Sequence, residues 1–127
     1  MPGQGGLSIM VWSCGPQAPE CAATPFVVAQ AAAALELEVE MLFTAQAVQW
    51  LLLDRRHTPI GFGACMQPVG AYLEACAKDG VKIRACSQAL AAAGFTREAL
   101  VPECCGLGGT VAFVEHTQDP HWRTLVF

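Results

Sequence analysis

Short apolar runs of strand length alternate along this chain with segments that favour helix, and this alternation restricts the possible folds. A run from Leu7 to Ser13 precedes an alanine-rich segment from Ala22 to Leu35. A second run from Glu38 to Phe43 precedes helix-forming residues from Ala45 to Leu53. Strands that alternate with helices form a mostly parallel sheet with helices on both faces. The sequence therefore predicts an α/β fold.

Two residues indicate where the first two helices begin. Pro25 is tolerated in the helix over residues 22–35 only because it falls in the first turn, where its missing N–H costs no hydrogen bond. Thr44 can cap the helix over residues 45–53 with its hydroxyl group. Both signals agree with a helix that follows each strand.

The alternation continues through the second half of the chain. Pro68 can begin a helix that runs to Lys78 and stops at Gly80, because proline suits the first turn and glycine suits the residue after a helix. Residues 54–66 before it form a long loop, and such loops are often functional. Further strands are expected over residues 81–85, 100–101 and 122–127, and further helices over residues 87–93 and 110–116.

Composition favours a single domain over residues 1–127 with a large apolar core. Hydrophobic residues make up 54% of the 127 residues, and charged residues only 14%. The formal net charge is −4 and the seven Lys and Arg residues are scattered, so the chain lacks the basic stripe that nucleic-acid binding requires. We therefore expect no nucleic-acid partner.

The longest apolar segment is too short to span a membrane. It runs from Cys21 to Leu35, is interrupted by Thr24, Pro25 and Gln30, and falls short of the roughly 20 residues that cross a bilayer. No Lys or Arg precedes the first apolar residues, which argues against a secretory signal peptide. The expected location is the cytoplasm.

Cysteine is unusually frequent in this chain. An odd number, seven, cannot close into a complete set of disulfides. In a reducing cytosol such a pattern indicates catalytic, redox or metal chemistry, with buried cysteine as a small hydrophobic residue as the competing explanation. The cysteines occupy positions 14, 21, 65, 76, 86, 104 and 105.

Cys86 is the principal catalytic candidate. It lies where the strand over residues 81–85 gives way to the helix over residues 87–93. Unpaired N–H groups and the partial positive charge at a helix N-terminus favour the thiolate over the thiol form of a cysteine. The thiolate is the species that attacks sulfur, so this position is suited to sulfur chemistry.

Several segments together resemble the DsrE/DsrF-like family. The runs at residues 80–86, 94–100 and 108–113 are similar to motifs of that family, as are residues 37–44 and 124–127. The resemblance implies a three-layer α/β/α fold, flavodoxin-like in outline, with a five-stranded parallel sheet. It also implies homo-oligomers, trimers or hexamers, and a cytoplasmic role in sulfur trafficking or oxidation.

The resemblance also implies how such a protein works. The sulfur-binding cysteine of the family matches Cys86, which would accept sulfane sulfur as a persulfide. It would pass that sulfur to a TusA-type sulfur carrier or another sulfurtransferase, with neither a metal nor an organic cofactor. The chain departs from the family pattern at Glu103-Cys104-Cys105-Gly106, which leaves open whether a second thiol takes part.

Other residues are candidates for supporting roles. Cys14, Cys65 and the pair Cys104-Cys105 are possible second thiols, which we expect near the carboxyl edge of the sheet together with Cys86. Cys21 and Cys76 are expected to be packed in apolar surroundings. Arg84 and Lys82 share one face of their strand, opposite Ile83 and Ala85. They could add positive potential, or simply pair with carboxylates.

Two classes of function compete with a sulfur carrier. One is a non-catalytic interaction subunit of a sulfur-relay complex. The other is a thiol redox or metal-binding protein that uses Cys86 with Cys104 or Cys105. Zinc usually requires Cys-x-x-Cys or closely spaced histidines, and the sequence contains neither.

Overall fold

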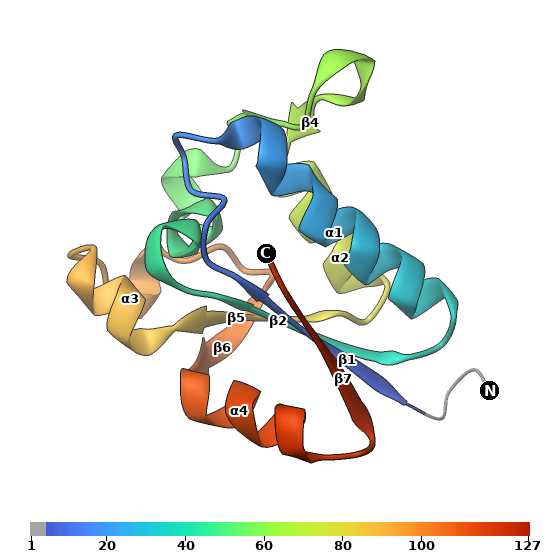
Figure 1. The fold of residues 1–127 in the computed structure, drawn as a ribbon. Coiled ribbons are helices and arrows are strands. Elements are labelled where there is room, and N and C mark those ends of the chain that lie inside the picture. Colours follow the sequence, from blue (N-terminus) through green and yellow to red (C-terminus); the bar gives the residue numbers. More distant parts are fainter. Residues whose placement is uncertain (1–4) are drawn as a thin grey trace.

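A parallel five-stranded sheet forms the centre of this computed structural model, which describes residues 5–127 (Figure 1). The strand order is β6-β5-β2-β1-β7, and every neighbouring pair is parallel. The strands are β1 (Gly6–Val11), β2 (Glu38–Phe43), β5 (Lys82–Cys86), β6 (Cys104–Gly108) and β7 (Trp122–Val126). The predicted α/β fold with a five-stranded parallel sheet is thus confirmed.

The helices and the remaining short elements connect these strands. The α-helices are α1 (Pro19–Ala34), α2 (Val69–Lys78), α3 (Ser87–Ala92) and α4 (Thr110–Gln118). The chain also contains 3₁₀ helices. The longer one is η1 (Ala45–Leu51), and the single turns are η2 (Leu53–Arg55), η3 (Gly63–Cys65) and η4 (Arg97–Ala99). A small antiparallel hairpin pairs β3 (Pro59–Ile60) with β4 (Gln67–Pro68). Strand β3 lies within the predicted loop over residues 54–66, and β4 directly follows it.

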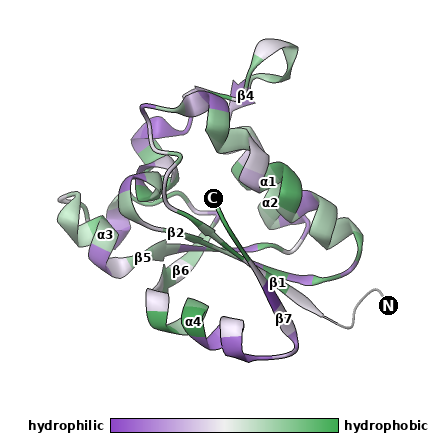
Figure 2. Ribbon diagram, in the orientation of Figure 1, coloured by the Kyte–Doolittle hydropathy of each residue, from purple (hydrophilic) through white to green (hydrophobic). Residues whose placement is uncertain are grey.

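Helices cover the two faces of the sheet unequally. Figure 1 shows α1 and α2 on one face and α4 on the other. Side chains alternate along β1, so that Ile9 and Val11 enter the main core beneath α1 and α2, whereas Ser8 and Met10 face α4. Figure 2 colours most of α1 as hydrophobic, in agreement with its position over this core. The two faces of the sheet therefore carry two separate clusters of buried side chains.

Helix α1 begins earlier than predicted. It starts at Pro19, so Pro25 lies inside the helix and not in its first turn. Proline has no N–H to donate to the carbonyl group of Cys21, and a proline within a helix is normally unfavourable. Burial compensates here, because Pro25 itself is buried and the neighbouring Phe26 and Ala29 are 0% exposed. Tertiary packing has overridden the local preference.

The predicted strand at residues 100–101 is wrong. Leu100 forms only an isolated bridge with Leu52, and the fourth strand in chain order in the sheet is β6, four residues later. Two glycines in β6 give it the composition of a loop. Gly108 fits closely there, since a Cβ atom at that position would lie 3.3 Å from Cδ1 of Leu42 and 3.4 Å from Cβ of Arg84, and the Leu42 side chain would have to shift to make room. Residues 104–108 form a strand because they pair with β5, although their own preference for strand is weak.

Residues 45–53 also differ from the prediction. Residues 45–51 form the 3₁₀ segment η1 and not an α-helix, Leu53 begins η2, and Thr44 makes no side-chain cap. Ala45 has a φ of 50°, a left-handed conformation that alanine rarely adopts, so the chain enters η1 in a geometry unlike an ordinary α-helix start. The segment is held by burial, because Ala47, Val48 and Trp50 are all 0% exposed.

A double ion pair connects the segment after η2 to the residue before β6. The two terminal nitrogens of Arg56 each lie 2.6 Å from a different carboxylate oxygen of Glu103, and the Glu103 side chain is 12% exposed. Hydrogen bonds from Arg56 hold the pKa of the Glu103 carboxyl group below its ordinary value. Such bidentate pairs are stronger than single-contact surface pairs.

We expect Arg56→Met to lower the free energy of unfolding at neutral pH by roughly 1–3 kcal/mol, the usual range for lost hydrogen bonds to a charged group. The folded-state pKa of Glu103 is lowered, so its stabilisation is present above the unfolded pKa and is lost as pH falls through the folded pKa. The difference between wild type and variant should therefore shrink below about pH 4. Urea unfolding at several pH values measures it.

Arg55→Met provides a matched control for that measurement. Arg55 precedes Arg56 directly but makes only a 3.3 Å hydrogen bond to Gln49. We expect its replacement to change stability by no more than about 0.5 kcal/mol at any pH. An equal loss in both variants, or a loss from Arg56→Met that is independent of pH, would contradict the assignment.

No helix in the described part of the chain, residues 5–127, is both long and apolar enough to cross a membrane.

Candidate functional site

Cys86 occupies the strand-to-helix junction that the sequence indicated. It is the last residue of β5 and the residue that precedes α3, with φ −64° and ψ 121°. Because Cys86 ends β5, it lies at the carboxyl edge of the sheet. Strand β5 is an interior strand, with β2 on one side and β6 on the other. Ligands of open parallel sheets usually bind beyond this edge.

The thiol of Cys86 is covered by its neighbours. Cys86 is 4% exposed and packs with Leu42 and Phe113, and Met10 and Ala89 border the same cluster. Phe113 belongs to α4, and Leu42 to β2, so the cover comes from two elements distant in the sequence. Little of Cys86 is therefore open to a dissolved reagent, and movement of one of these side chains would increase access to it.

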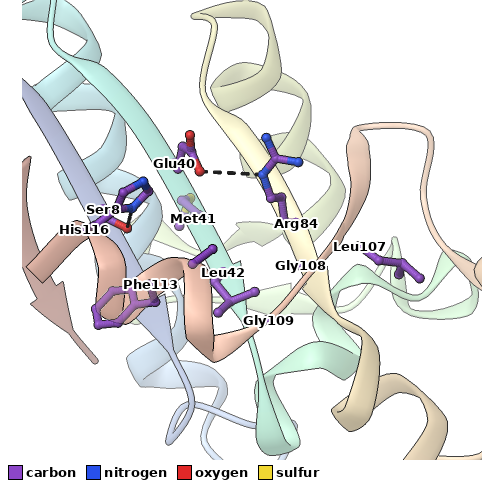
Figure 3. Close-up of a pocket in the computed structure, with 11 residues that line it drawn as sticks. Ser8, Glu40, Met41, Leu42, Arg84, Leu107, Gly108, Gly109, Phe113 and His116 are labelled. Carbon is purple, nitrogen blue, oxygen red and sulfur yellow. Dashed lines mark hydrogen bonds and ion pairs between the residues drawn. The ribbon is translucent and has the colours of Figure 1, made fainter.

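A pocket of about 310 Å³ lies beside this cluster, between α4 and the sheet (Figure 3). Leu42 and Phe113 line the pocket and also contact Cys86. Gly108 and Gly109 form part of its wall where β6 passes into α4. The pocket and the thiol are therefore separated by the same two apolar side chains.

Two polar pairs line the pocket, as Figure 3 shows. Nε of Arg84 lies 3.6 Å from Oε1 of Glu40. Nδ1 of His116 lies 2.9 Å from Oγ of Ser8, and the His116 ring stacks on Trp122 with ring centroids 4.0 Å apart. The pocket thus combines an apolar floor with one cation, one carboxylate and one imidazole.

Arg84 and Lys82 lie as the sequence predicted, on the face of β5 opposite Ile83 and Ala85. Arg84 faces the same side of the sheet as Cys86. The two residues are two positions apart in β5, a spacing of about 7 Å along the strand. Its partner Glu40 offsets much of its charge. Lys82 is exposed at the opposite, amino end of the strand, so only Arg84 lies near the pocket.

Sequence reasoning missed three polar residues of the pocket. His116 contacts Ser8, 108 positions earlier in the chain, and nothing in the sequence around either residue indicates this pairing. Ser8 is the buried polar residue within the apolar strand β1, and that contrast was the available signal. Glu40 could have been recognised from its alternation with the buried residues of β2.

The structure places Cys104 and Cys105 away from Cys86. Cys104 is in register with Ile83, near the amino end of β5, whereas Gly108 is in register with Cys86. The prediction that these cysteines lie at the carboxyl edge is therefore wrong. The error follows from the misplaced strand, because the strand expected at residues 100–101 lies instead at Cys104–Gly108 and begins with these two cysteines.

The remaining cysteines divide between the edge, the surface and the core. Cys21 is exposed on α1, so the prediction that it is packed in apolar surroundings is wrong. Cys14 follows β1 at the carboxyl edge, as predicted, and is 7% exposed. Cys65 is exposed in η3, and its hairpin contacts the start of α1 through a 2.9 Å hydrogen bond from Gly61 N–H to the Pro19 carbonyl. Cys76 is fully buried in α2, where burial raises the pKa of its thiol to about 12, so its predicted packing role is confirmed.

All seven cysteines are free thiols. Burial raises the pKa of Cys104, whose thiol donates to the carbonyl oxygen of Gly106 at 3.3 Å. Within residues 5–127, no group of three or more His, Cys, Asp or Glu side chains is arranged to hold a metal ion.

Comparisons with known proteins support one family and one fold. The family model of the DsrE/DsrF-like family matches residues 8–127. The ychN protein from E. coli has a similar crystal structure, with a TM-score of 0.76 and 19% identity over 97% of this chain and 99% of that chain. A protein of unknown function, MTH1491 from Methanobacterium thermoautotrophicum, has a TM-score of 0.71 and 16% identity over the same shares of the two chains. No curated protein matches the chain.

Proposed function

Because the chain belongs to the DsrE/DsrF-like family and so has a role related to sulfur relay, we propose that Cys86 carries sulfane sulfur as a persulfide and passes it to a partner thiol. The position of Cys86 is the observation that supports this proposal. It ends an interior strand at the carboxyl edge, precedes a helix, and adjoins a pocket through Leu42 and Phe113. No other cysteine of the chain combines these features in the described residues 5–127.

The proposed chemistry needs only thiol exchange. The Cys86 thiolate attacks a sulfane sulfur of a polysulfide or persulfide, forms a new S–S bond, and expels the rest of the donor as a thiolate or a shorter polysulfide anion. A partner thiolate then attacks the outer sulfur and expels the Cys86 thiolate. Each step forms one bond to sulfur and breaks one, so no external electron source and no cofactor is required.

The pocket is the proposed entrance for the donor. Its apolar floor suits the polarisable sulfur chain of a polysulfide, and the guanidinium group of Arg84 provides a cation for the anionic end, although Glu40 shares it. A shift of Phe113 or Leu42 would connect the pocket with the thiol. Arg84 would act here as a positioning residue.

The partner we propose is a TusA-type sulfur carrier or another sulfurtransferase, and the chain itself would act as a sulfurtransferase-type relay in the cytoplasm. A homo-oligomer, a trimer or hexamer, is part of the same proposal. It is supported by apolar side chains left exposed on the outer side of α4 and on the edge strand β7, with exposures of 74% for Val111, 55% for Val114 and 56% for Val126.

One observation favours a second candidate function, that of a non-catalytic interaction subunit. Cys86 is only 4% exposed, and a thiol that stays covered cannot exchange sulfur. A redox pair of Cys86 with Cys104 is less well supported. Cys104 is in register with Ile83, three residues before Cys86, which gives a separation of about 10 Å along the strand, beyond the roughly 7 Å limit for a disulfide.

Sulfur loading followed by tryptic mapping tests the proposal. Trypsin cleaves after Lys and Arg, so Cys86 falls in the fragment of residues 85–97, and Cys104 and Cys105 fall in the fragment of residues 98–123. After reduced protein is incubated with polysulfide, we expect the 85–97 fragment to gain about 32 Da, one sulfur atom, and to lose it to a thiol reductant. Loading of the 98–123 fragment alone would move the site, and no loading would favour the interaction subunit.

A further inference from the structure

The pocket beside Cys86 holds two opposite charges that are only loosely paired. Arg84 and Glu40 both line it, and Figure 3 shows their side chains directed toward one another. Nε of Arg84 lies 3.6 Å from Oε1 of Glu40, which is longer than a hydrogen bond. A guanidinium group has five N–H donors and a carboxylate about four acceptor sites. Both groups can therefore bind a ligand while they still face each other.

This charge pair distinguishes between classes of ligand. An inorganic polysulfide is an anion, so Arg84 attracts it but Glu40 repels it. A zwitterion with one ammonium and one carboxylate group matches both side chains. The ammonium group also meets a second acceptor, because Ser8 is in register with Glu40 on the neighbouring strand and lines the same pocket. Charge complementarity therefore favours a zwitterion over a simple anion.

The size and the apolar part of the pocket define the ligand further. A volume of about 310 Å³ is at the lower end of the range of small-molecule sites, roughly 300–1,000 Å³, so the ligand is small. Leu42 and Phe113 provide an apolar surface in the same pocket and contact Cys86 from it. The pocket therefore suits an amino acid with an apolar or sulfur-containing side chain.

We propose that this pocket binds the persulfide of an α-amino acid, in its simplest form cysteine persulfide, as the sulfur donor of Cys86; the inference rests on the proposed function. Glu40 binds the ammonium group and Arg84 the carboxylate group, and the two sulfur atoms lie against Leu42 and Phe113. Arg84 and Cys86 are about 7 Å apart along β5. Four bonds of about 1.5–2 Å each join the carboxylate carbon of the donor to its outer sulfur, a length comparable with this spacing.

The transfer step balances without a further reactant. The Cys86 thiolate attacks the outer sulfur of the donor R–S–SH, forms a persulfide on Cys86, and expels R–S⁻. One S–S bond forms and one breaks, and the proton on the outer sulfur moves with that sulfur. The expelled thiolate of free cysteine then takes a proton from water. The product keeps both charges of the donor and is shorter by one sulfur atom.

Binding of an unreactive analogue to Cys86→Ala tests the pocket without sulfur transfer. S-methylcysteine carries a methyl group in place of the outer sulfur, and 3-(methylthio)propionate differs from it only by the absence of the ammonium group. Isothermal titration calorimetry measures both affinities. We expect S-methylcysteine to bind at least about tenfold more tightly, the usual contribution of a hydrogen bond to a charged group. Equal affinities, or no binding of S-methylcysteine at millimolar concentration, would overturn the proposal.

Glu40→Gln, added to Cys86→Ala, tests the assigned role of the carboxylate. S-methylcysteine should bind about tenfold more weakly, whereas 3-(methylthio)propionate should bind more tightly because the repulsion is removed. Damage to the fold would instead weaken both. Glu38→Gln is the matched control, since Glu38 lies two residues earlier in β2 and pairs with His121 at 3.4 Å. It should leave both affinities within about twofold. An unchanged ratio of the two affinities in Glu40→Gln would contradict the assignment.

The binding site and the sulfur carrier can fail separately. If polysulfide loads Cys86 but S-methylcysteine does not bind, Cys86 remains the sulfur carrier and the amino-acid donor is wrong. If S-methylcysteine binds with the expected selectivity but neither polysulfide nor cysteine persulfide loads Cys86, the carrier proposal fails and the amino-acid site is confirmed.

Discussion

Replacement of Cys86 with alanine is expected to remove sulfur loading from the 85–97 fragment completely, because no other thiol lies in that fragment. Alanine is smaller than cysteine and apolar, so it fits the space among Leu42, Phe113 and Ala89. The free energy of unfolding should fall by only about 1 kcal/mol, the cost of a small cavity. Loss of loading in a folded protein would therefore report chemistry and not unfolding.

The double variant Cys104→Ala/Cys105→Ala is the matched control for this experiment. These cysteines lie at the far end of β5 from Cys86, so their removal should leave loading of the 85–97 fragment within about twofold of wild type. Equal loading of wild type and Cys86→Ala in intact-mass spectra would contradict the assignment of Cys86. Loss of all loading in the double variant would assign the sulfur to β6.

Replacement of Trp50 with alanine is expected to have the largest effect on stability, a loss of about 3–5 kcal/mol in the free energy of unfolding. Trp50 is 0% exposed and is the largest fully buried side chain of the structure. Its indole N–H also donates to the backbone carbonyl of Cys14, 36 residues away. The variant therefore loses packing and leaves a buried acceptor without its partner.

Two further substitutions separate these contributions. Trp12 is 52% exposed, so Trp12→Ala should change stability by at most about 0.5 kcal/mol. Trp50→Phe keeps most of the buried ring but removes the N–H, and we expect an intermediate loss of roughly 1–3 kcal/mol. Urea unfolding followed by circular dichroism avoids the change in tryptophan fluorescence. A similar loss for Trp12→Ala and Trp50→Ala would show that burial does not decide the effect.

The predictions that were confirmed depend on local patterns. Strand β2 has the predicted boundaries, and β5 ends one residue later than predicted because Cys86 itself completes the strand. Helix α2 begins one residue after Pro68, and Gly94, with a φ of 85°, follows α3 as expected of a glycine beyond a helix. In each case a few adjacent residues carry the signal.

The predictions that failed depend on contacts between distant segments. Strand β6 is recognisable only through its pairing with β5, since Gly106 and Gly108 have the local preference of a loop. The cover over Cys86 includes Phe113 of α4, and one polar pair of the pocket joins His116 to Ser8; neither contact was predicted. The residues next to each partner in the sequence do not indicate such long-range contacts, so only the folded structure reveals them.

The sheet also acts as a partition between two of the cysteines at its carboxyl edge. Cys14 and Cys86 both lie at its carboxyl edge, but their side chains belong to clusters on opposite faces. A direct bond between them would require the strand ends to part. Sulfur loaded on Cys86 should therefore stay on the α4 side of the sheet and should not pass to Cys14 of the same chain.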